Sequence, residues 1–195
     1  MNERLVLKVG GSLMDQKDAP ELLRKFLDSN FEGKQVNLLM GGGKVVDVLR
    51  NFDATNYAAP ETIHWCCVDL LHLTYELAVG WLPSASRIET RKTFLDHQTN
   101  DAPGVFLLAT RTFYTREDGD VLPRDWNTTS DSIAAFLAKK LSINRLVVLK
   151  SCDIPDAITI DQAASLGIVD ANFPTTSIGL DVQLRSIRNA APMSH

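Results

Sequence analysis

The amino-acid sequence predicts an α/β fold built on a mainly parallel sheet. Strand-like hydrophobic runs alternate with segments whose apolar residues recur at helical spacing along the 195 residues. Two of the runs are followed directly by glycine-rich turns, and a cluster of small polar residues opens a helix further on. In a parallel sheet such turns gather at the carboxyl edge of the strands, where ligands bind in folds of this class.

Four strands and five helices are expected along the chain. The strands are expected at residues 5–9, 35–40, 105–109 and 145–149. The helices are expected after Asp18, after Gly43, and over residues 61–79, 132–141 and 161–166. Asp18 can cap the first helix, with Pro20 in its first turn, and Pro60 stands at the start of the third. Gly167 stops the last helix in the usual C-terminal position.

Composition limits the class of protein. With 45% hydrophobic and 23% charged residues the chain is typical of a globular protein, and no internal repeat or linker stands out. We therefore expect one domain over 1–188 and a flexible tail over 189–195. A net charge of -4 argues against a broad basic surface for nucleic acid.

The expected compartment is the cytoplasm. No apolar run approaches the ~20 residues of a membrane span, and no charged-then-apolar signal segment is recognisable. The three cysteines lack paired spacing, which is typical of reduced thiols. Adjacent Cys66 and Cys67 do not form a CxxC motif, and we interpret them as small buried hydrophobes rather than metal ligands.

The first candidate site is the run from Lys8 to Ser12, in which a strand delivers a lysine and the pair Gly10-Gly11 follows. Residues without a Cβ atom let backbone N–H groups approach an anion closely. A helix opening at the glycine pair would direct its positive dipole end to the same place. Lysine, amides and helix terminus together predict a polyphosphate site, although a lysine beside a simple Gly-Gly turn explains the same residues about as well.

Two further junctions lie on the same predicted edge. Gly41, Gly42 and Gly43 separate the second strand from the next helix, without the spacing or the GK[ST] ending of a Walker A loop. The run from Trp126 to Ser132 opens another helix, and its Ser, Thr and Asp residues are also what ordinary helix caps consist of. Taken together, the three junctions favour a site that holds two anionic groups side by side.

This combination resembles the amino-acid kinase superfamily, whose members include acetylglutamate, aspartate, uridylate, isopentenyl-phosphate and fosfomycin kinases. The shared marks are a KxGGS first strand, a GGG loop and a TSD-type helix start, here at Lys8–Ser12, Gly41–Gly43 and Thr129–Asp131. The resemblance covers roughly residues 4 to 175. It implies a three-layer α/β/α sandwich, here with a shortened C-terminal nucleotide part. The compact length, the WxxTSDS form at 126–132 and the run VDANFP at 169–174 look like the short kinases of methanofuran biosynthesis and their bacterial relatives in tetrahydromethanopterin-linked one-carbon pathways.

The resemblance implies an ATP- and Mg²⁺-dependent phosphoryl transfer to a small phosphate-bearing acceptor, in a homodimer or higher homo-oligomer. It implies that Lys8 neutralises charge on the transferring group and that Asp131 orients Lys8. The donor phosphates would meet Gly10, Gly11 and Ser12. The acceptor's own phosphate would meet Gly41, Gly42, Gly43 and Ser130. A phosphate acceptor is already ionised at pH 7, so no general base is required.

His64 lies on the helix that should flank the acceptor. It can contact the acceptor's phosphate or polar head, and the interpretation as an ordinary helix histidine is equally open. Asp69 is five residues further on, about 140° around the helix, so the two side chains cannot both face one ligand. Asp170 and Phe173 either shape the acceptor pocket or, as we favour, pack the end of the sheet.

The chain departs from the superfamily after the fourth strand, where members read close to TDVDGIY and this chain reads KSCDIPD at 150–156. Only Asp153 survives as a match, and Lys150 can supply a second cation from the same sheet edge. These losses keep an alternative open, namely a protein of this fold that binds nucleotide or phosphate without transferring it. The intact Lys8 and Asp131 favour the enzyme.

Overall fold

The computed structural model describes residues 3–189, so the expected tail lies outside the described residues except for Asn189. Its centre is a six-stranded sheet of order β3-β4-β2-β1-β5-β6, in which every adjacent pair is parallel. The strands are β1 (Arg4–Val9), β2 (Gln35–Met40), β3 (Ser86–Ile88), β4 (Gly104–Leu108), β5 (Arg145–Lys150) and β6 (Asp181–Ser186). The predicted parallel α/β sheet is confirmed.

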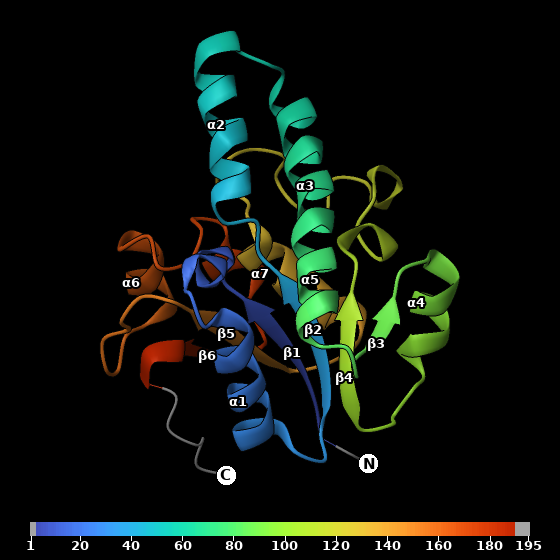
Figure 1. The fold of residues 1–195 in the computed structure, drawn as a ribbon. Coiled ribbons are helices and arrows are strands. Elements are labelled where there is room, and N and C mark those ends of the chain that lie inside the picture. Colours follow the sequence, from blue (N-terminus) through green and yellow to red (C-terminus); the bar gives the residue numbers. More distant parts are fainter. Residues whose placement is uncertain (1–2, 190–195) are drawn as a thin grey trace.

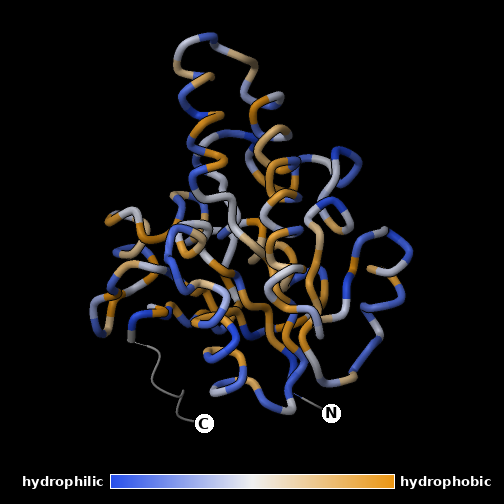
Figure 2. Tube along the Cα trace, viewed as in Figure 1, coloured by the Kyte–Doolittle hydropathy of each residue, from blue (hydrophilic) through white to orange (hydrophobic). Residues whose placement is uncertain are grey.

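Helices cover both faces of the sheet and give three layers (Figure 1). On one face lie α1 (Ala19–Phe31) and the C-terminal half of α3 (Pro60–Trp81), packed on alternate residues of β1 such as Leu5 and Leu7. On the other face lie four further helices and the N-terminal half of α3. These are α4 (Arg91–Gln98), α5 (Ser130–Lys140), α6 (Ile160–Ser165) and α7 (Phe173–Thr176). Figure 2 shows the strands between the layers as the most continuously hydrophobic part of the chain.

The pleat of the central strands decides where the charged residues at the sheet edge point. Successive side chains of a strand face opposite sides, so Lys8 shares a face with Val6, which packs in the core under α5. Lys8 pairs with Val148 of β5, and Lys150 lies two residues beyond that partner. Both lysines therefore project from the carboxyl edge toward the start of α5.

Helix α2 (Lys44–Asn56) and the first part of α3 form a hairpin that stands above the carboxyl ends of the strands (Figure 1). No residue of α2 is fully buried, and Val48 and Phe52 are 55% and 61% exposed. The apolar residues of α2 are therefore not part of the domain core, because this helix packs on α3 rather than on the sheet.

The structure differs from the sequence-based expectation in three places. The pair Gly10-Gly11 opens a five-residue 3₁₀ helix, Gly11–Asp15, and α1 begins only at Ala19 with Asp18 at its N-cap. No long helix therefore directs its dipole at the glycine pair. Strands β3 and β6 and helix α4 have no counterpart in the prediction, because β3 is three residues long and α4 carries few apolar residues. Helix α5 begins at Ser130, two residues before the expected start, with Thr129 at its N-cap.

Candidate active site

The centre of the site is a carboxylate held between two lysines. Asp131, in the first turn of α5, has its Oδ1 2.7 Å from Nζ of Lys8 and its Oδ2 2.8 Å from Nζ of Lys150. The side chains of Lys8 and Asp131 are each only 4% exposed, and that of Lys150 is 12% exposed. Three ionised groups on this edge therefore carry one net positive charge, which suits a site for polyanions.

Burial and mutual attraction act in opposite directions on these groups. Burial lowers the pKa of Lys8 to about 8, with the Asp131 charge opposing this shift and the Lys150 charge adding to it. Burial disfavours ionisation of Asp131, but the two lysine cations outweigh it and hold the pKa of that carboxyl below its usual value. The carboxylate is thus fixed as an anion, while Lys8 titrates closer to neutrality than an ordinary lysine.

The two glycine-rich turns touch one another beside this cluster. A Cβ atom on Gly11 would lie 1.9 Å from the backbone nitrogen of Gly43, and Gly43 itself has a φ of +55°. The N–H groups of Gly10 and Gly41 already donate to the carbonyls of Leu149 and Val9, at 2.7 and 2.8 Å. These two glycines therefore shape the turns. In the part of the chain that the structure describes, no acceptor is assigned to the N–H groups of Gly11, Gly42 and Gly43.

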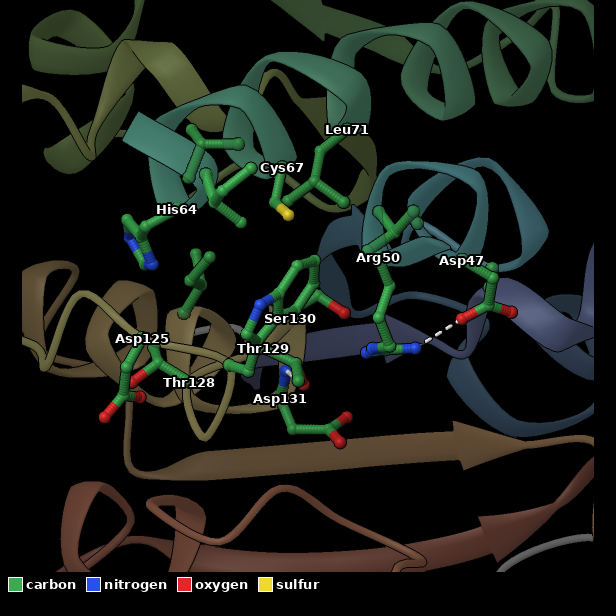
Figure 3. A pocket seen from close by; sticks show the side chains of 18 of the residues that line it. Asp47, Arg50, His64, Cys67, Leu71, Asp125, Thr128, Thr129, Ser130 and Asp131 are labelled. Carbon is green, nitrogen blue, oxygen red and sulfur yellow. Dashed lines mark hydrogen bonds and ion pairs between the residues drawn. The ribbon is translucent and has the colours of Figure 1, made fainter. Parts of the chain in front are cut away.

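A cavity of about 210 Å³ opens next to the turns, between α2, α3 and the segment before α5. Figure 3 shows His64, Cys67 and Leu71 on one wall and Thr128 to Asp131 on the opposite one. The cavity is charged at its Lys8 end and largely apolar in its body. The apolar lining comprises Val46, Ile63, Cys67, Val68, Leu71 and Ile133. This volume lies below the ~300 Å³ at which pockets for drug-sized ligands begin, so it suits a small acceptor.

One wall of the cavity is an indole ring held from two sides. The Trp126 Nε1–H donates to the Asp53 carboxylate at 2.8 Å, and the Arg50 guanidinium lies 4.8 Å from the ring centre. Both partners come from α2, so Trp126 ties the segment before α5 to the helix hairpin. A ring fixed in this way is a flat contact surface for a planar ligand.

Known proteins share this fold and part of this sequence. No protein-family model matches the chain. The curated "[5-(aminomethyl)furan-3-yl]methyl phosphate kinase" of Methanocaldococcus jannaschii is 23% identical over 185 residues, covering 87% of this chain and 80% of that protein. UMP kinase from Ureaplasma parvum superposes with a TM-score of 0.67 at 12% identity, over 97% of this chain and 92% of that one. The chain is thus similar in sequence to a kinase of the amino-acid kinase superfamily and shares the fold of that superfamily.

Two other solved structures have the same fold. Uridylate kinase from Archaeoglobus fulgidus gives a TM-score of 0.59 at 17% identity, over 95% of this chain and 92% of that one. Aspartate kinase from Synechocystis gives 0.63 at 15% identity, over 96% of this chain but only 39% of that longer one. The predicted resemblance to this superfamily and the predicted fold are confirmed.

Most of the residues predicted to meet ligands gather around the cavity. The lining includes Lys8, Gly11, Gly42, Gly43, His64, Ser130, Asp131 and Lys150. Gly41 is buried directly behind it, where an added Cβ would lie 3.0 Å from Ser130 Oγ. Ser12 is outside the lining, and its hydroxyl lies 2.6 Å from that of Ser151. Asp153 is exposed and pairs with Arg188 at 3.8 Å, so the structure does not bring it to this cluster.

His64 is buried between α3 and the loop before α5. Its Nε2 lies 2.9 Å from the Tyr114 hydroxyl, while burial and the nearby Arg124 cation lower its pKa. The ring is therefore neutral near pH 7 and serves as a polar member of the cavity wall. Asp69 instead lies on an exposed part of α3 and pairs with Arg111, so the two side chains do point in different directions.

Sequence reasoning missed Arg50 and the enclosing role of Trp126. Trp126 was visible as the first residue of the small-polar run, but nothing in the sequence shows that Asp53 is its partner 73 residues earlier. Cys67 is half-buried in the cavity wall rather than in the core, and burial raises its pKa to about 11, so it is a neutral thiol. Among residues 3–189, no three His, Cys, Asp or Glu side chains form a candidate metal centre, and no helix is long and apolar enough to cross a membrane.

Proposed function

We propose that this amino-acid kinase transfers the γ-phosphoryl group of ATP to a small phosphate monoester and so forms a diphosphate. The observation that carries the proposal is the position of Asp131 between Lys8 and Lys150, where the glycine turns meet a small cavity. Two cations held by one carboxylate can neutralise two neighbouring phosphates while keeping a fixed geometry. Positioning and charge neutralisation are what phosphoryl transfer requires of a protein.

In the proposed reaction an oxygen of the acceptor phosphate attacks the γ-phosphorus in line, and the bond from that phosphorus to the bridging β–γ oxygen breaks to release ADP. Lys8 and Lys150 neutralise charge on the equatorial and leaving oxygens. The N–H groups of Gly42 and Gly43 hold the acceptor phosphate, and those of Gly11 and Ser12 hold the donor phosphates. The attacking oxygen is already ionised, so Asp131 orients the lysines and takes no proton.

The nucleotide's phosphates would carry Mg²⁺, since this ion commonly binds with several waters and substrate phosphates rather than in an all-protein cage. Both oxygens of Asp131, the carboxylate at the centre of the site, are engaged by lysines. When bound, the ion would add charge neutralisation between the β- and γ-phosphates. The lysines remain the fixed cations of the site.

The acceptor we favour is a ring-bearing phosphate monoester of the furan-methyl phosphate type. Two observations support it: the small volume of the cavity and its apolar body beside the Trp126 indole. The M. jannaschii relative is named for such a substrate. A nucleoside monophosphate or free aspartate, after which the structural neighbours are named, is the natural comparison in an acceptor screen.

A second candidate function is nucleotide or phosphate binding without transfer. It is favoured by the segment after β5, where Cys152 and Asp153 are exposed and the superfamily's usual residues are replaced. The enclosed pair of Lys8 and Asp131 favours the enzyme, because binding alone has less need of an oriented, buried lysine.

Thermal unfolding with Mg-ATP, followed by a coupled assay of ADP release, tests both candidates. A ligand at 100 times its Kd adds ~2.7 kcal/mol to the free energy of unfolding, which is readily measured. We expect a shift with Mg-ATP and ADP release that depends on the furan-methyl phosphate, with less on UMP or aspartate. A shift without turnover on any acceptor would establish the binder, and no shift with any nucleotide would refute both candidates.

We also propose that the protein is a cytoplasmic homodimer. The three cysteines are free thiols, as in a reducing compartment. Large apolar side chains that are half or more exposed lie on α2 and on the C-terminal half of α3, namely Val48, Phe52, Leu73 and Leu77. Figure 2 shows hydrophobic residues continuing along both helices beyond the sheet. Light scattering after gel filtration should give twice the chain mass, and Leu73→Glu should halve it. A monomer at every concentration would contradict the proposal.

A further inference from the structure

A second buried carboxylate lies behind the site and holds the start of α5. Asp170, 8% exposed, stands in the loop before α7. Its Oδ2 accepts from the backbone N–H and the hydroxyl of Thr129, at 2.9 and 2.8 Å, and from the backbone N–H of Ser132 at 3.0 Å. Its Oδ1 accepts from the Ser132 hydroxyl at 2.6 Å. One carboxylate thus satisfies four donors from a segment 38 and 41 residues away in the sequence.

These four donors flank the central residue of the site. The first N–H groups of a helix have no partner within the helix, and a carboxylate at this end is also favoured by the helix dipole. Thr129 and Ser132 bracket Asp131, whose own N–H donates to the Thr129 hydroxyl at 3.3 Å. A displacement of either neighbour therefore moves the carboxylate of Asp131 relative to the two lysines.

The residues that follow Asp170 in the chain make further hydrogen bonds to the start of α5 and to the segment before it. Asn172 Nδ2 donates to the Thr128 hydroxyl at 2.9 Å, and its backbone N–H donates to the Asn127 carbonyl at 3.2 Å. Thr176, in α7, donates through its hydroxyl to that of Ser132 at 3.1 Å. The chain around α7 is thus bonded to one wall of the cavity rather than only to the end of the sheet.

We propose that Asp170 is a positioning residue for phosphoryl transfer, which acts through the start of α5 to hold the Asp131 carboxylate between Lys8 and Lys150. The inference rests on the proposed kinase function. Asp170 touches neither lysine directly through a hydrogen bond, and its partners are the neutral groups of α5. Its contribution is geometric, and misplacement of reacting groups by about 1 Å can cost on the order of a hundredfold in rate.

Asp170→Asn tests this because it keeps the size of the side chain but replaces one accepting oxygen by an N–H₂ group that faces donors. We expect kcat for ADP release to fall by about tenfold to a hundredfold, with KM for ATP changed by less than threefold. Asp161→Asn removes an exposed carboxylate from the first turn of α6 and should leave kcat unchanged.

The pH profile gives a readout that a purely structural role would not move. Lys8 is faced by Asp131 from α5 and Lys150 from β5, with Asp170 at longer range from the loop before α7. Loosening Asp131 and removing the Asp170 charge both lower the pKa of Lys8. The alkaline limb of kcat/KM should therefore move to lower pH in Asp170→Asn and stay in place in Asp161→Asn. Hydrogen exchange at the Thr129 and Ser132 amides should become faster in Asp170→Asn.

The outcomes distinguish a failure of the proposed kinase function from a failure of the proposed role of Asp170. If the wild type binds nucleotide but turns over no acceptor, the proposed function fails before any variant is compared. If the wild type is active and Asp170→Asn has the same kcat and the same alkaline limb, the inference about Asp170 is wrong. Should Asp170→Asn not fold, Ser132→Ala removes the 2.6 Å bond to Asp170 and the 3.1 Å bond from Thr176 but keeps the backbone donors to Asp170. It should give a several-fold loss of kcat with the same direction of pH shift. A wild-type profile in that variant would equally overturn the proposal.

Discussion

The acceptor side and the donor side of Lys8 are built differently. On the acceptor side, α2, α3 and the segment before α5 enclose a small cavity with an apolar body and a fixed indole wall. On the donor side, Ser12, Cys152 and Asp153 are exposed. The groups available there to bind a ligand are backbone N–H groups, hydroxyls and Lys150. Under the proposed function, the difference predicts that shape selects the acceptor and that charge and backbone groups hold the phosphates of the donor.

The largest effect is expected from Lys8→Met, which removes the cation that both sides share. We predict a fall in kcat of about 10²- to 10³-fold, the usual consequence of losing one group that stabilises charge in a transition state. Methionine keeps the length of the side chain, and Lys150 remains as a partner for Asp131, so the fold should persist. Single-turnover rates of ADP formation measure the effect, and a loss below tenfold would contradict the assigned role.

A smaller effect, confined to the donor side, is expected from Lys150→Ala. Lys150 is more exposed than Lys8 but engages the same carboxylate. We predict a fall in kcat of about tenfold to a hundredfold at saturating ATP, with little change in KM for the acceptor. Lys139→Ala is the matched control, since this lysine is exposed at the far end of α5. An undiminished rate in Lys150→Ala would refute its role as the second cation.

On the acceptor side we expect KM for the acceptor to change, whereas Lys150→Ala should leave it nearly unchanged. Trp126→Ala should raise KM for a ring-bearing acceptor by on the order of tenfold, because it removes the stacking surface, and should leave KM for ATP unchanged. Trp126→Phe keeps an aromatic wall but loses the bond to Asp53, so its KM should lie between those of the wild type and Trp126→Ala. If both variants changed KM for ATP instead, the division between the two sides would be wrong.

The parts of the fold that follow from local pattern were predictable from the sequence. The four main strands, the start of α3 at Pro60 and the N-cap position of Asp18 are each encoded in a few neighbouring residues. Strand β6 alternates Val182 and Leu184 with polar residues but lies at the sheet edge, where the pattern is short and half-buried. Helix α2 shows the limit of amphipathic patterns, because its apolar residues are half-buried or exposed and the helix packs on α3 above the sheet rather than on the domain core.

In the candidate site, too, some residues were predictable from local sequence and others were not. Lys8 and Asp131 follow from motifs, and the parallel sheet brings them to one edge. The contacts of Trp126 with α2 and of Asp170 with α5 join segments 73 and 38 residues apart, and no local signal marks either partner. Asp53 looks like an ordinary surface charge in the sequence, and Asp170 stands in a recognisable run that does not show its contact with α5. Only the way the chain folds back shows which donors they meet.

The smallest expected effect is a pH dependence set by Lys8, the cation that both sides share. Lys8 must be protonated to neutralise phosphate charge, and burial lowers its pKa to about 8 with the Lys150 charge contributing in the same direction. Activity should therefore be retained below that value and decline as pH rises through it, in kcat/KM, which reports the free enzyme. The acid limb should come from the second ionisation of the acceptor phosphate, near pH ~6.

Variants and ligands should move the alkaline limb in defined directions. Bound phosphates favour the charged lysine, so the limb in kcat should lie at higher pH than the limb in kcat/KM. Lys150→Ala removes a like charge beside Lys8 and should also move the limb to higher pH, whereas Trp126→Ala, on the acceptor side, should leave it in place. Because these shifts follow from charge alone, a limb that moved in Trp126→Ala but not in Lys150→Ala would reverse the assignment of the two sides.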